Sequence, residues 1–417
     1  MEILLLNIRQ LVQIEDQQPV EYRAGKDMLH LPLIADAYLH IANGVIQGFG
    51  KMHEIPDHLL DAQDDRFVID CTGKLVFPSF CDSHTHIVYA GSREMEFVDK
   101  IKGMSYEEIA QRGGGILNSA QRLHQTSEEE LFDQTMIRIN EISRLGTGAV
   151  EIKSGYGLSP EDEIKILRVI KRLKKESDLT IRSTFLGAHA IPAQYKENPS
   201  EYVDLIINEM IPVVASEELA DFIDVFCEKG FFSVEDTDRI LMAGMKYGMR
   251  PKIHANELSM SGGVPVGVKY NALSVDHLDY MDDKDIDCLK NTETMPTVLP
   301  GASFFLSLPL APVRKMIDAG LPVALASDFN PGSSPSGNMK FVQSLGCIKY
   351  KMLPEEVINA TTINSAYAMG LSSTHGTIAV GKVANVFITR PIPGYEYFPY
   401  AFGSDLIEIT ILNGEIH

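Results

Sequence analysis

The middle of the chain alternates short apolar runs with longer segments of helical period, and this alternation constrains the fold more than any other feature. Helical segments are clear from their start signals: one begins at Ser159, with Pro160 in the first turn and acidic residues behind it. Between the helices lie eight candidate strands, at residues 79–83, 149–153, 182–187, 222–226, 251–253, 272–275, 295–299 and 322–326. Eight strands alternating with helices over about 300 residues predict an α/β fold, the (β/α)₈ barrel.

The two ends of the chain have a different pattern. Short apolar runs typical of strands lie near the start, at residues 3–8, 38–42 and 45–49, and near the end, at residues 377–380, 384–389 and 407–412. The pairs Asn43-Gly44 and Asn413-Gly414 close a run at each end, and Asn-Gly is a strong hairpin signal. We therefore predict a small β-sandwich domain formed by residues 1–75 and 376–417, with the barrel of residues 76–375 inserted between them.

Composition and charge exclude several classes of protein. The 417 residues contain 37 Lys and Arg against 57 Asp and Glu, a formal charge of −20 at pH 7, which argues against nucleic acid or an anionic membrane as partner. No apolar run approaches the roughly 18 residues of a spanning helix, and the first residues lack the basic leader of a secretory signal. Five widely spaced cysteines fit reduced thiols. We expect a cytoplasmic protein.

Reactive residues follow the predicted strands, where a barrel of this type carries its active site. His84 and His86 follow the first strand and project to one side, as residues i and i+2 of an extended chain do. His254 follows the fifth strand and Asp328 the eighth. Three imidazoles and a carboxylate at one barrel mouth suit Zn²⁺ or Fe²⁺/Fe³⁺, and an open position for water would make the site catalytic. The sequence thus predicts one metal ion per chain.

The segment FPSFCDSHTH, followed by His254, His277 and Asp328, resembles the amidohydrolase superfamily, whose barrels carry a β domain built from both chain ends. Other runs are similar to one branch of it: GSREMEF (91–97), RGGGI (112–116), EIKSGYGL (151–158), LGAHAIP (186–192), VFCEKG (225–230), IHANEL (253–258), SVDHL (274–278) and SDFNPGSSP (327–335). That branch hydrolyses a ring C–N bond of the small molecule 4-imidazolone-5-propanoate to give N-formimidoyl-L-glutamate, in histidine degradation. The resemblance implies such a metal-dependent hydrolase, with a homodimer as its assembly.

The resemblance also implies where the substrate and the opened product bind. It gives five contact residues: Tyr156, His189, Asn330, Gly332 and Ser333. The propionate of the substrate needs a cation in an otherwise acidic protein, and an arginine offers a planar fork suited to a carboxylate. Arg93, in the loop after His86, is our choice.

Three residues are candidates for moving protons. Glu257 lies three residues after His254, so one turn could bring its carboxylate beside the attacking water, and we assign it the proton shuttle to the leaving ring nitrogen and a contact with the substrate. His277 holds the position of a histidine that hydrogen-bonds the hydroxide or polarises the reacting group in related enzymes. The general base stays divided among Asp328, His277 and Glu257.

Three other interpretations stay open. A deaminase, or another cyclic amide or amidine hydrolase on the same barrel, would use the same metal residues. A binuclear hydrolase of the hydantoinase type would need a carboxylated lysine at the end of the fourth strand, close to Lys229. The third is a non-catalytic barrel that binds a metal or a ligand, and the joint presence of Glu257, His277 and Asp328 argues against it.

Overall fold

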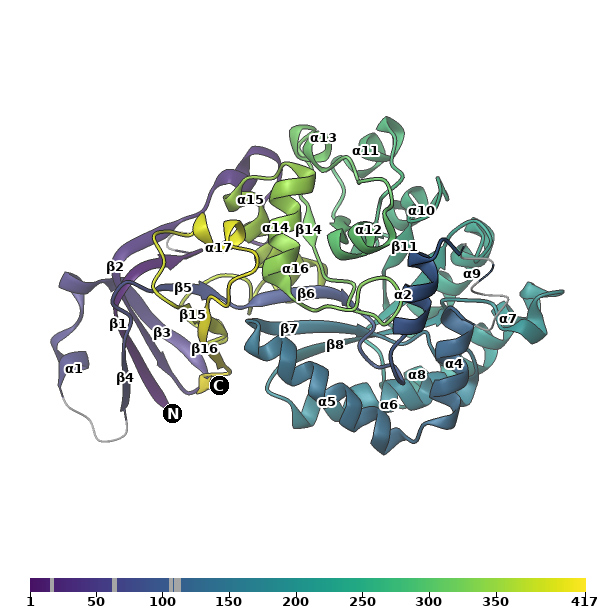
Figure 1. The fold of residues 1–417 in the computed structure, drawn as a ribbon, viewed down its shortest axis with the longest axis horizontal. Coiled ribbons are helices and arrows are strands. Elements are labelled where there is room, and N and C mark those ends of the chain that lie inside the picture. Colours follow the sequence, from purple (N-terminus) through teal and green to yellow (C-terminus); the bar gives the residue numbers. More distant parts are fainter. Residues whose placement is uncertain (16–18, 62–65, 105–107, 109–113) are drawn as a thin grey trace.

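A computed structural model describes residues 1–417 except 16–18, 62–65, 105–107 and 109–113. Figure 1 shows two bodies side by side, a sheet that contains both chain ends and a larger barrel wrapped by helices. The first sheet contains β1 (Glu2–Val12), β2 (Leu33–Ala42), β3 (Val45–Lys51), β4 (Arg66–Asp70), β5 (Leu75–Pro78), β15 (Val386–Thr389), β16 (Ile407–Leu412) and β17 (Glu415–Ile416).

Pairing between distant segments joins the two chain ends in this sheet. β5 runs parallel to β1 and antiparallel to β15, so the N-terminal and C-terminal strands share one hydrogen-bonded ladder. Both Asn-Gly pairs lie in hairpins as predicted, with left-handed φ angles at Asn43 (53°), Gly44 (78°), Asn413 (51°) and Gly414 (76°). The prediction of a strand at residues 377–380 is wrong. Within the described residues Ile378 forms a single bridge, to Ile14, because the chain turns at the left-handed glycines Gly376 and Gly381 on either side.

The second sheet is the barrel, and its strands run parallel to one another. They are β6 (Phe80–Thr85), β7 (Thr147–Lys153), β8 (Thr180–Ala188), β9 (Phe222–Cys227), β11 (Ile253–Ala255), β12 (Ser274–His277), β13 (Met295–Val298) and β14 (Ala324–Leu325). A short β10 (Arg250–Pro251) pairs with β9. The ring closes just after β14, where the N–H of Asp328 donates to the carbonyl of His84 (3.0 Å) and the N–H of His86 to that of Phe329 (2.9 Å). The predicted barrel is confirmed, and each of the eight predicted runs overlaps one of its strands.

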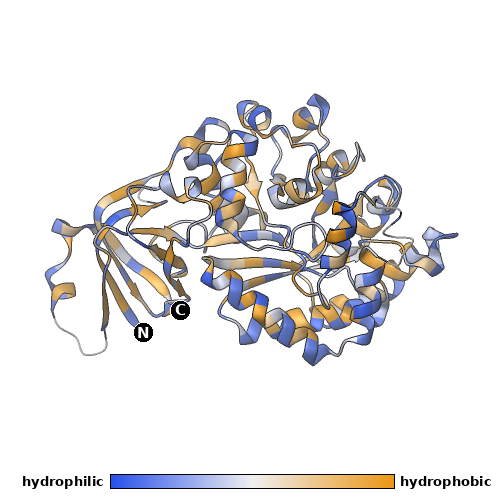
Figure 2. Ribbon diagram, viewed as in Figure 1, coloured by the Kyte–Doolittle hydropathy of each residue, from blue (hydrophilic) through white to orange (hydrophobic). Residues whose placement is uncertain are grey.

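Helices surround the barrel and turn their apolar faces toward it (Figure 2). Those that follow barrel strands include α2 (Glu94–Ile101), α4 (Ile116–Gln125), α5 (Glu128–Arg144), α6 (Pro160–Glu176), α7 (Pro199–Leu205), α8 (Ile211–Ser216), α9 (Val234–Met245), α10 (Gly263–Lys269), α11 (Asp283–Leu289), α12 (Pro300–Leu306), α13 (Val313–Asp318), α14 (Met339–Tyr350), α15 (Pro354–Thr361) and α16 (Ile363–Ala368). Short α1 (Asp57–Leu60) and α17 (Tyr397–Tyr400) belong to the chain ends. Ser159 caps α6 as predicted, accepting from the N–H of Asp162 at 3.2 Å. Among the helices of the described residues, none combines the length and the apolar content that crossing a membrane needs.

The expected domain limits stay a proposal. β5 extends to Pro78, three residues beyond the limit at residue 75, and still pairs with strands of the terminal sheet. β6 begins two residues later, at Phe80, and is the first strand of the barrel. The chain therefore passes from the terminal sheet into the barrel almost without a linker. This connection fixes where β6 begins, and so where His84, within β6, and His86, just after it, are placed.

Candidate active site

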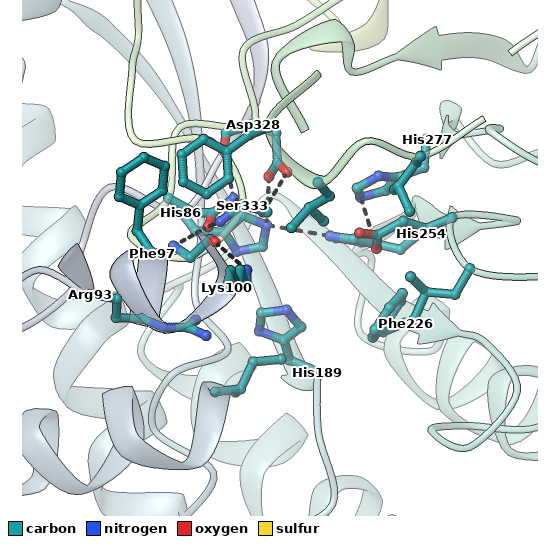
Figure 3. Close-up of a pocket in the computed structure, with 18 of the residues that line it drawn as sticks. His86, Arg93, Phe97, Lys100, His189, Phe226, His254, His277, Asp328 and Ser333 are labelled. Atoms are coloured by element: carbon teal, nitrogen blue, oxygen red, sulfur yellow. Dashed lines mark hydrogen bonds and ion pairs between the residues drawn. The ribbon is translucent and has the colours of Figure 1, made fainter. Parts of the chain in front are cut away.

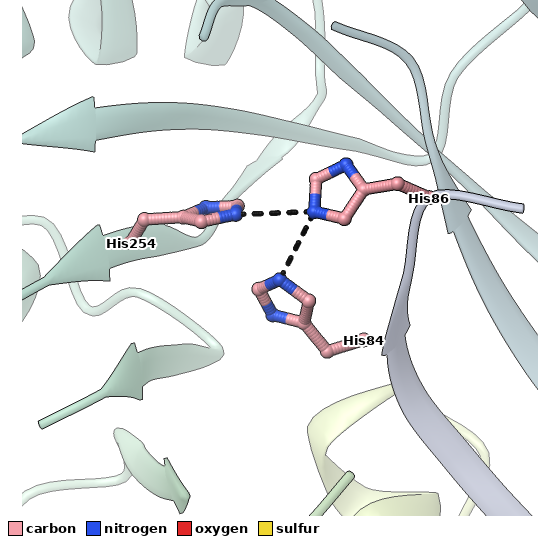
Figure 4. Close-up of side chains that lie close together, drawn as sticks. All are labelled: His84, His86 and His254. Atoms are coloured by element: carbon pink, nitrogen blue, oxygen red, sulfur yellow. Dashed lines mark hydrogen bonds between the residues drawn. The ribbon is translucent and has the colours of Figure 1, made fainter. Parts of the chain in front are cut away.

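Three imidazoles meet at the end of the barrel where the strands finish (Figure 4). The Nε2 atom of His86 lies 3.3 Å from Nε2 of His84 and 3.4 Å from Nε2 of His254. A tetrahedral zinc ion with Zn–N bonds of about 2.0–2.1 Å separates its nitrogen ligands by about 3.3–3.4 Å. All three side chains are buried. The observed spacing therefore fits three ligands of a single ion.

Asp328 adds a carboxylate to this cluster. Its Oδ1 atom lies 3.7 Å from Nε2 of both His84 and His86. The residue has a left-handed backbone (φ 53°) and is tied to β6 by the bond from its N–H to the carbonyl of His84. Asp328 therefore lies beside two of the three clustered imidazoles, His84 and His86, although the predicted metal residues come from three separate parts of the barrel.

The protonation of the histidines suits metal binding. Burial, and then the nearby charge of Lys153, lowers the pKa of His84 well below its usual value of 6.5. Burial lowers the pKa of His86 in the same way. Both imidazoles are thus neutral and offer a nitrogen lone pair, which is the form that binds a metal.

Buried carboxylates orient two of the three imidazoles from behind. Asp276 Oδ2 lies 2.6 Å from Nδ1 of His84, and Asp224 Oδ2 lies 3.0 Å from Nδ1 of His254. Asp224 also accepts from the backbone N–H of His254 at 3.1 Å. A carboxylate on Nδ1 fixes the proton there and leaves Nε2 free to face an ion. The sequence analysis did not identify these two aspartates.

A buried charge network lies beneath the three histidines and was also missed. Lys153 Nζ lies 2.6 Å from Oε1 of Glu151, 2.8 Å from Oδ2 of Asp224 and 3.7 Å from Oδ2 of Asp276. Lys252 pairs with the other oxygen of Glu151 and donates to the carbonyl of Ser83 at 3.1 Å. Glu151 and Lys153 are i and i+2 on β7, so both point into the barrel. Two charged residues two positions apart in an otherwise apolar strand were the sequence signal that could have revealed this network.

His277 lies beside His254 (Figure 3), and Glu257 lines the same cavity next to His277. His277 Nε2 is 3.6 Å from Oε2 of Glu257, and its Nδ1 is 4.0 Å from Oδ2 of Asp279. Burial, followed by the charge of Asp328, raises the pKa of Glu257 well above its usual value of 4.5. A carboxyl group whose pKa is raised in this way holds a proton more readily near neutral pH, as a proton donor must.

A buried glutamate holds the turn that carries Tyr156. The carboxylate of Glu163 accepts three backbone hydrogen bonds, from the N–H groups of Gly155 (3.0 Å), Gly157 (2.7 Å) and Leu158 (2.9 Å). Gly155 has a left-handed φ of 115°, and its carbonyl lies 2.9 Å from Nδ1 of His189. A side chain at Gly157 would overlap the backbone of Glu163, so only glycine fits there. Tyr156 and His189 are thereby placed as neighbours, with ring centroids 5.4 Å apart.

These groups open into one cavity of about 660 Å³. All of the expected substrate and proton-transfer residues line it: Arg93, Tyr156, His189, Glu257, His277, Asp328, Asn330, Gly332 and Ser333. His86 and His254 also face the cavity, whereas His84 is fully buried. Further lining residues that the sequence analysis did not single out are Phe97, Lys100, Ile101, Ile116, Phe226, Phe231, Leu258, Phe305, Leu306, Ser307 and Leu308.

The loop after Asp328 closes one side of this cavity. Asn330 Oδ1 accepts from the N–H groups of Gly332 and Ser333, both at 2.8 Å. Its Nδ2 donates to the carbonyl of Asp328 (2.7 Å) and to Oγ of Ser333 (2.6 Å). These bonds tie the loop to the residue that faces the histidines. Arg93 lies against Gly332 and is held by Glu96, whose Oε2 accepts from its Nε (2.9 Å) and Nη2 (2.6 Å).

Lys229 does not reach the site. Its side chain is exposed just beyond β9, and Lys229 is absent from the cavity lining. In a binuclear hydrolase the bridging lysine must face both ions at the barrel mouth. The position of Lys229 therefore argues against the binuclear alternative.

Comparisons with known proteins agree with this fold and site. The amidohydrolase family profile matches residues 99–416. Imidazolonepropionases of Flavobacterium johnsoniae and Christiangramia forsetii are each 56% identical to the chain, over 413 residues (99% of both chains) and 416 residues (100% of both chains). Among solved structures, Escherichia coli guanine deaminase superposes over 100% of this chain and 99% of its own with a TM-score of 0.74. Klebsiella pneumoniae 5-methylcytosine deaminase covers 100% and 97% with a TM-score of 0.70.

The two deaminases are only 14% and 19% identical to the chain, so they show its fold alone. The profile covers most of the sequence, and the relatives match it over its full length. The resemblance seen in the motifs is confirmed: the chain is an amidohydrolase and belongs to the imidazolonepropionase family.

Proposed function

We propose that the protein hydrolyses a ring C–N bond of 4-imidazolone-5-propanoate to give N-formimidoyl-L-glutamate, a step of histidine degradation. The observation that carries the proposal is one cavity that joins His86, His254 and Asp328 of the metal cluster, a buried proton-transfer pair and the cation Arg93. Full-length relatives named imidazolonepropionase support the same reaction. The substrate has a polar ring and a carboxylate, which match the two ends of this cavity.

We propose His84, His86, His254 and Asp328 as the ligands of one Zn²⁺ or Fe²⁺/Fe³⁺ per chain. A divalent ion bound by them lowers the pKa of water toward about 7 and so supplies hydroxide near neutral pH. The donor set of three imidazole nitrogens and one carboxylate oxygen is suited to either metal. Asp224 and Asp276 fix the orientation of two of the imidazoles.

The chain's own residues then have to move one proton. Water adds to the ring carbonyl carbon, the C–N bond breaks, and the departing ring nitrogen needs a proton. Glu257 takes the proton from the water and returns it to that nitrogen; burial and the charge of Asp328 raise the pKa of its carboxyl group, which favours the uptake of the proton from the water. His277, 3.6 Å from Glu257, orients this carboxyl and hydrogen-bonds the attacking oxygen. Asp328 shares the role of base.

Arg93 binds the propionate, while Tyr156 and His189 contact the ring. Asn330, Gly332 and Ser333 hold the opened product through the polar groups of their loop. A cytoplasmic location is proposed because all five cysteines are free thiols, as a reducing compartment keeps them. The homodimer implied by the resemblance stays a prediction, which light scattering of the purified protein would test.

The direct test adds freshly generated 4-imidazolone-5-propanoate to metal-loaded protein and follows the loss of its ultraviolet absorbance. We expect turnover, a product that has gained one water by mass spectrometry, and loss of activity after treatment with a chelator. Restoring Zn²⁺ or Fe²⁺ separately then shows which ion supports the reaction. Absence of turnover, together with ammonia release from a cytosine-like or guanine-like base, would replace this proposal by the deaminase alternative.

A further inference from the structure

The cavity contains a second cation besides Arg93. Lys100 lies on α2, seven residues and about two helical turns after Arg93, so both side chains fall on the helix face that lines the cavity. Lys100 Nζ lies 5.8 Å from the ring centroid of Phe305 and donates to the carbonyl of Gly332 at 3.4 Å. Figure 3 shows both cations across the cavity from His254 and His277.

Gly332 lies between the two cations. Any side chain at this position would overlap Nη1 of Arg93, while the carbonyl oxygen of the same residue accepts from Lys100. The guanidinium and the ammonium group therefore flank a single residue. A carboxylate has two oxygens and is bound best when each oxygen meets its own donor. The arrangement suits a substrate carboxylate bound beside Gly332, where it can meet both Arg93 and Lys100.

The charges of the two cations are not equivalent. Arg93 forms an ion pair with Glu96 at 2.6 Å, which compensates its charge. Within the described residues Lys100 forms no ion pair, and its ammonium group donates to the neutral carbonyl of Gly332. Burial, and then the charge of Arg93, lowers the pKa of Lys100 from its usual 10.5, while the charge of Glu96 acts in the opposite direction. A partly buried cation that lacks a counter-ion is stabilised when an anion binds beside it.

We propose that Lys100 is the specificity-determining partner of Arg93, and that the two form a subsite selecting substrates that end in a carboxylate. This inference rests on the proposed function and names the part of the site that chooses the substrate. Arg93 orients the carboxylate through its planar fork, and Lys100 supplies a second positive charge that distinguishes a carboxylate from a neutral amide.

The test compares 4-imidazolone-5-propanoate with its propionamide, which has the same ring and shape without the charge. In Lys100→Met we expect KM for the acid to rise about 10- to 100-fold, the range expected for one lost hydrogen bond between charged groups, with kcat within a few fold. KM for the amide should change less than about 3-fold, since no charge is lost with it. Lys100→Arg keeps the charge and should retain most of the preference for the acid. Lys102→Met is the matched control, because Lys102 is exposed and outside the cavity lining.

A second readout separates this inference from the reaction itself. Calorimetry measures the binding of imidazole-4-propionate and imidazole-4-propionamide to metal-loaded protein, and needs no turnover. If the wild-type protein hydrolyses neither imidazolone, the proposed function fails, and the binding preference still decides the role of Lys100. Equal losses for acid and amide in Lys100→Met, or an unchanged preference for the acid, would overturn the proposal.

Discussion

Lys153 offers the sharpest test of how the barrel supports its metal residues. Its ammonium group contacts Glu151 at 2.6 Å and Asp224 at 2.8 Å, and all three side chains are almost completely buried. With Asp276 and Lys252, these residues form a network of three carboxylates and two ammonium groups, with a formal charge of −1. Lys153→Met keeps a similar volume and removes one positive charge, which leaves a charge of −2 beneath the metal residues.

Breaking a buried ion pair by removing one partner costs about 3–5 kcal/mol, because the remaining charge is left uncompensated in a medium of low polarity. Burial acts to lower the pKa of Lys153, but the carboxylates, Asp224 and then Glu151, outweigh it and raise that pKa. A raised lysine pKa means that the stabilisation is fully present below the pKa of the unfolded chain, near 10.4, and is lost only at higher pH. The full cost therefore applies at pH 7.

The unfolding entropy of about 2.1 cal/mol/K per residue, taken over a barrel of about 300 residues, converts this loss into a melting temperature lower by about 5–8 °C. The assay is calorimetry at pH 7, with and without chelator, so that an effect on metal binding is separated from an effect on the barrel. Lys175→Met, an exposed lysine on α6, is the matched control. Adding Glu151→Gln to Lys153→Met restores the formal charge to −1 and should recover part of the loss. A Lys153→Met variant that melts like the wild type, or a double variant no more stable than the single one, would contradict a stabilising role of these buried ion pairs.

The remaining predictions concern catalysis and substrate binding. Glu257→Gln should lower kcat by about 10²–10⁴-fold, since it removes the proton shuttle, while elemental analysis finds the same metal content; an unchanged kcat would remove Glu257 from the mechanism. Arg93→Ala should raise KM by about 10- to 100-fold with the metal retained, and an unchanged KM would place the propionate elsewhere. Gly332→Ala should also raise KM, because the added methyl group displaces the guanidinium of Arg93, and a crystal structure of the variant would show whether it moves.

Much of this molecule could be predicted because its strand ends carry distinctive residues. Parallel barrel strands are short apolar runs bounded by helix start signals, so their order in the sequence gives their order in the barrel. Each reactive residue then lies at the same end of the barrel. His84 therefore comes close to both His254 and Asp328, although the three residues are far apart in the sequence. The topology alone requires this meeting.

Other features could not be read because they depend on three-dimensional packing. Lys100 looks like any solvated helix lysine until α2 is placed over the cavity beside Gly332. Asp224 lies in β9 and Lys252 between β10 and β11, both among apolar neighbours, and one such segment does not show which charges it will meet inside the barrel. The missing strand at 377–380 has a similar cause, since local apolar character does not ensure a partner strand.

The backbone at the strand ends explains why the site needs so rigid a frame. His277 and Asp328 have left-handed φ angles of 84° and 53°, which cost a non-glycine residue of order 1–3 kcal/mol. A backbone hydrogen bond to the neighbouring strand holds each turn. The N–H of Leu278, the residue after His277, donates to the carbonyl of Ala255 at 3.1 Å, and the N–H of Asp328 donates to the carbonyl of His84 at 3.0 Å. The strained turns aim both side chains into the cavity, and the ladder of the barrel resists their relaxation. A network of buried charges beneath them has the same effect, because its ion pairs tie β7, β9, β11 and β12 together and so prevent the metal residues from drifting apart.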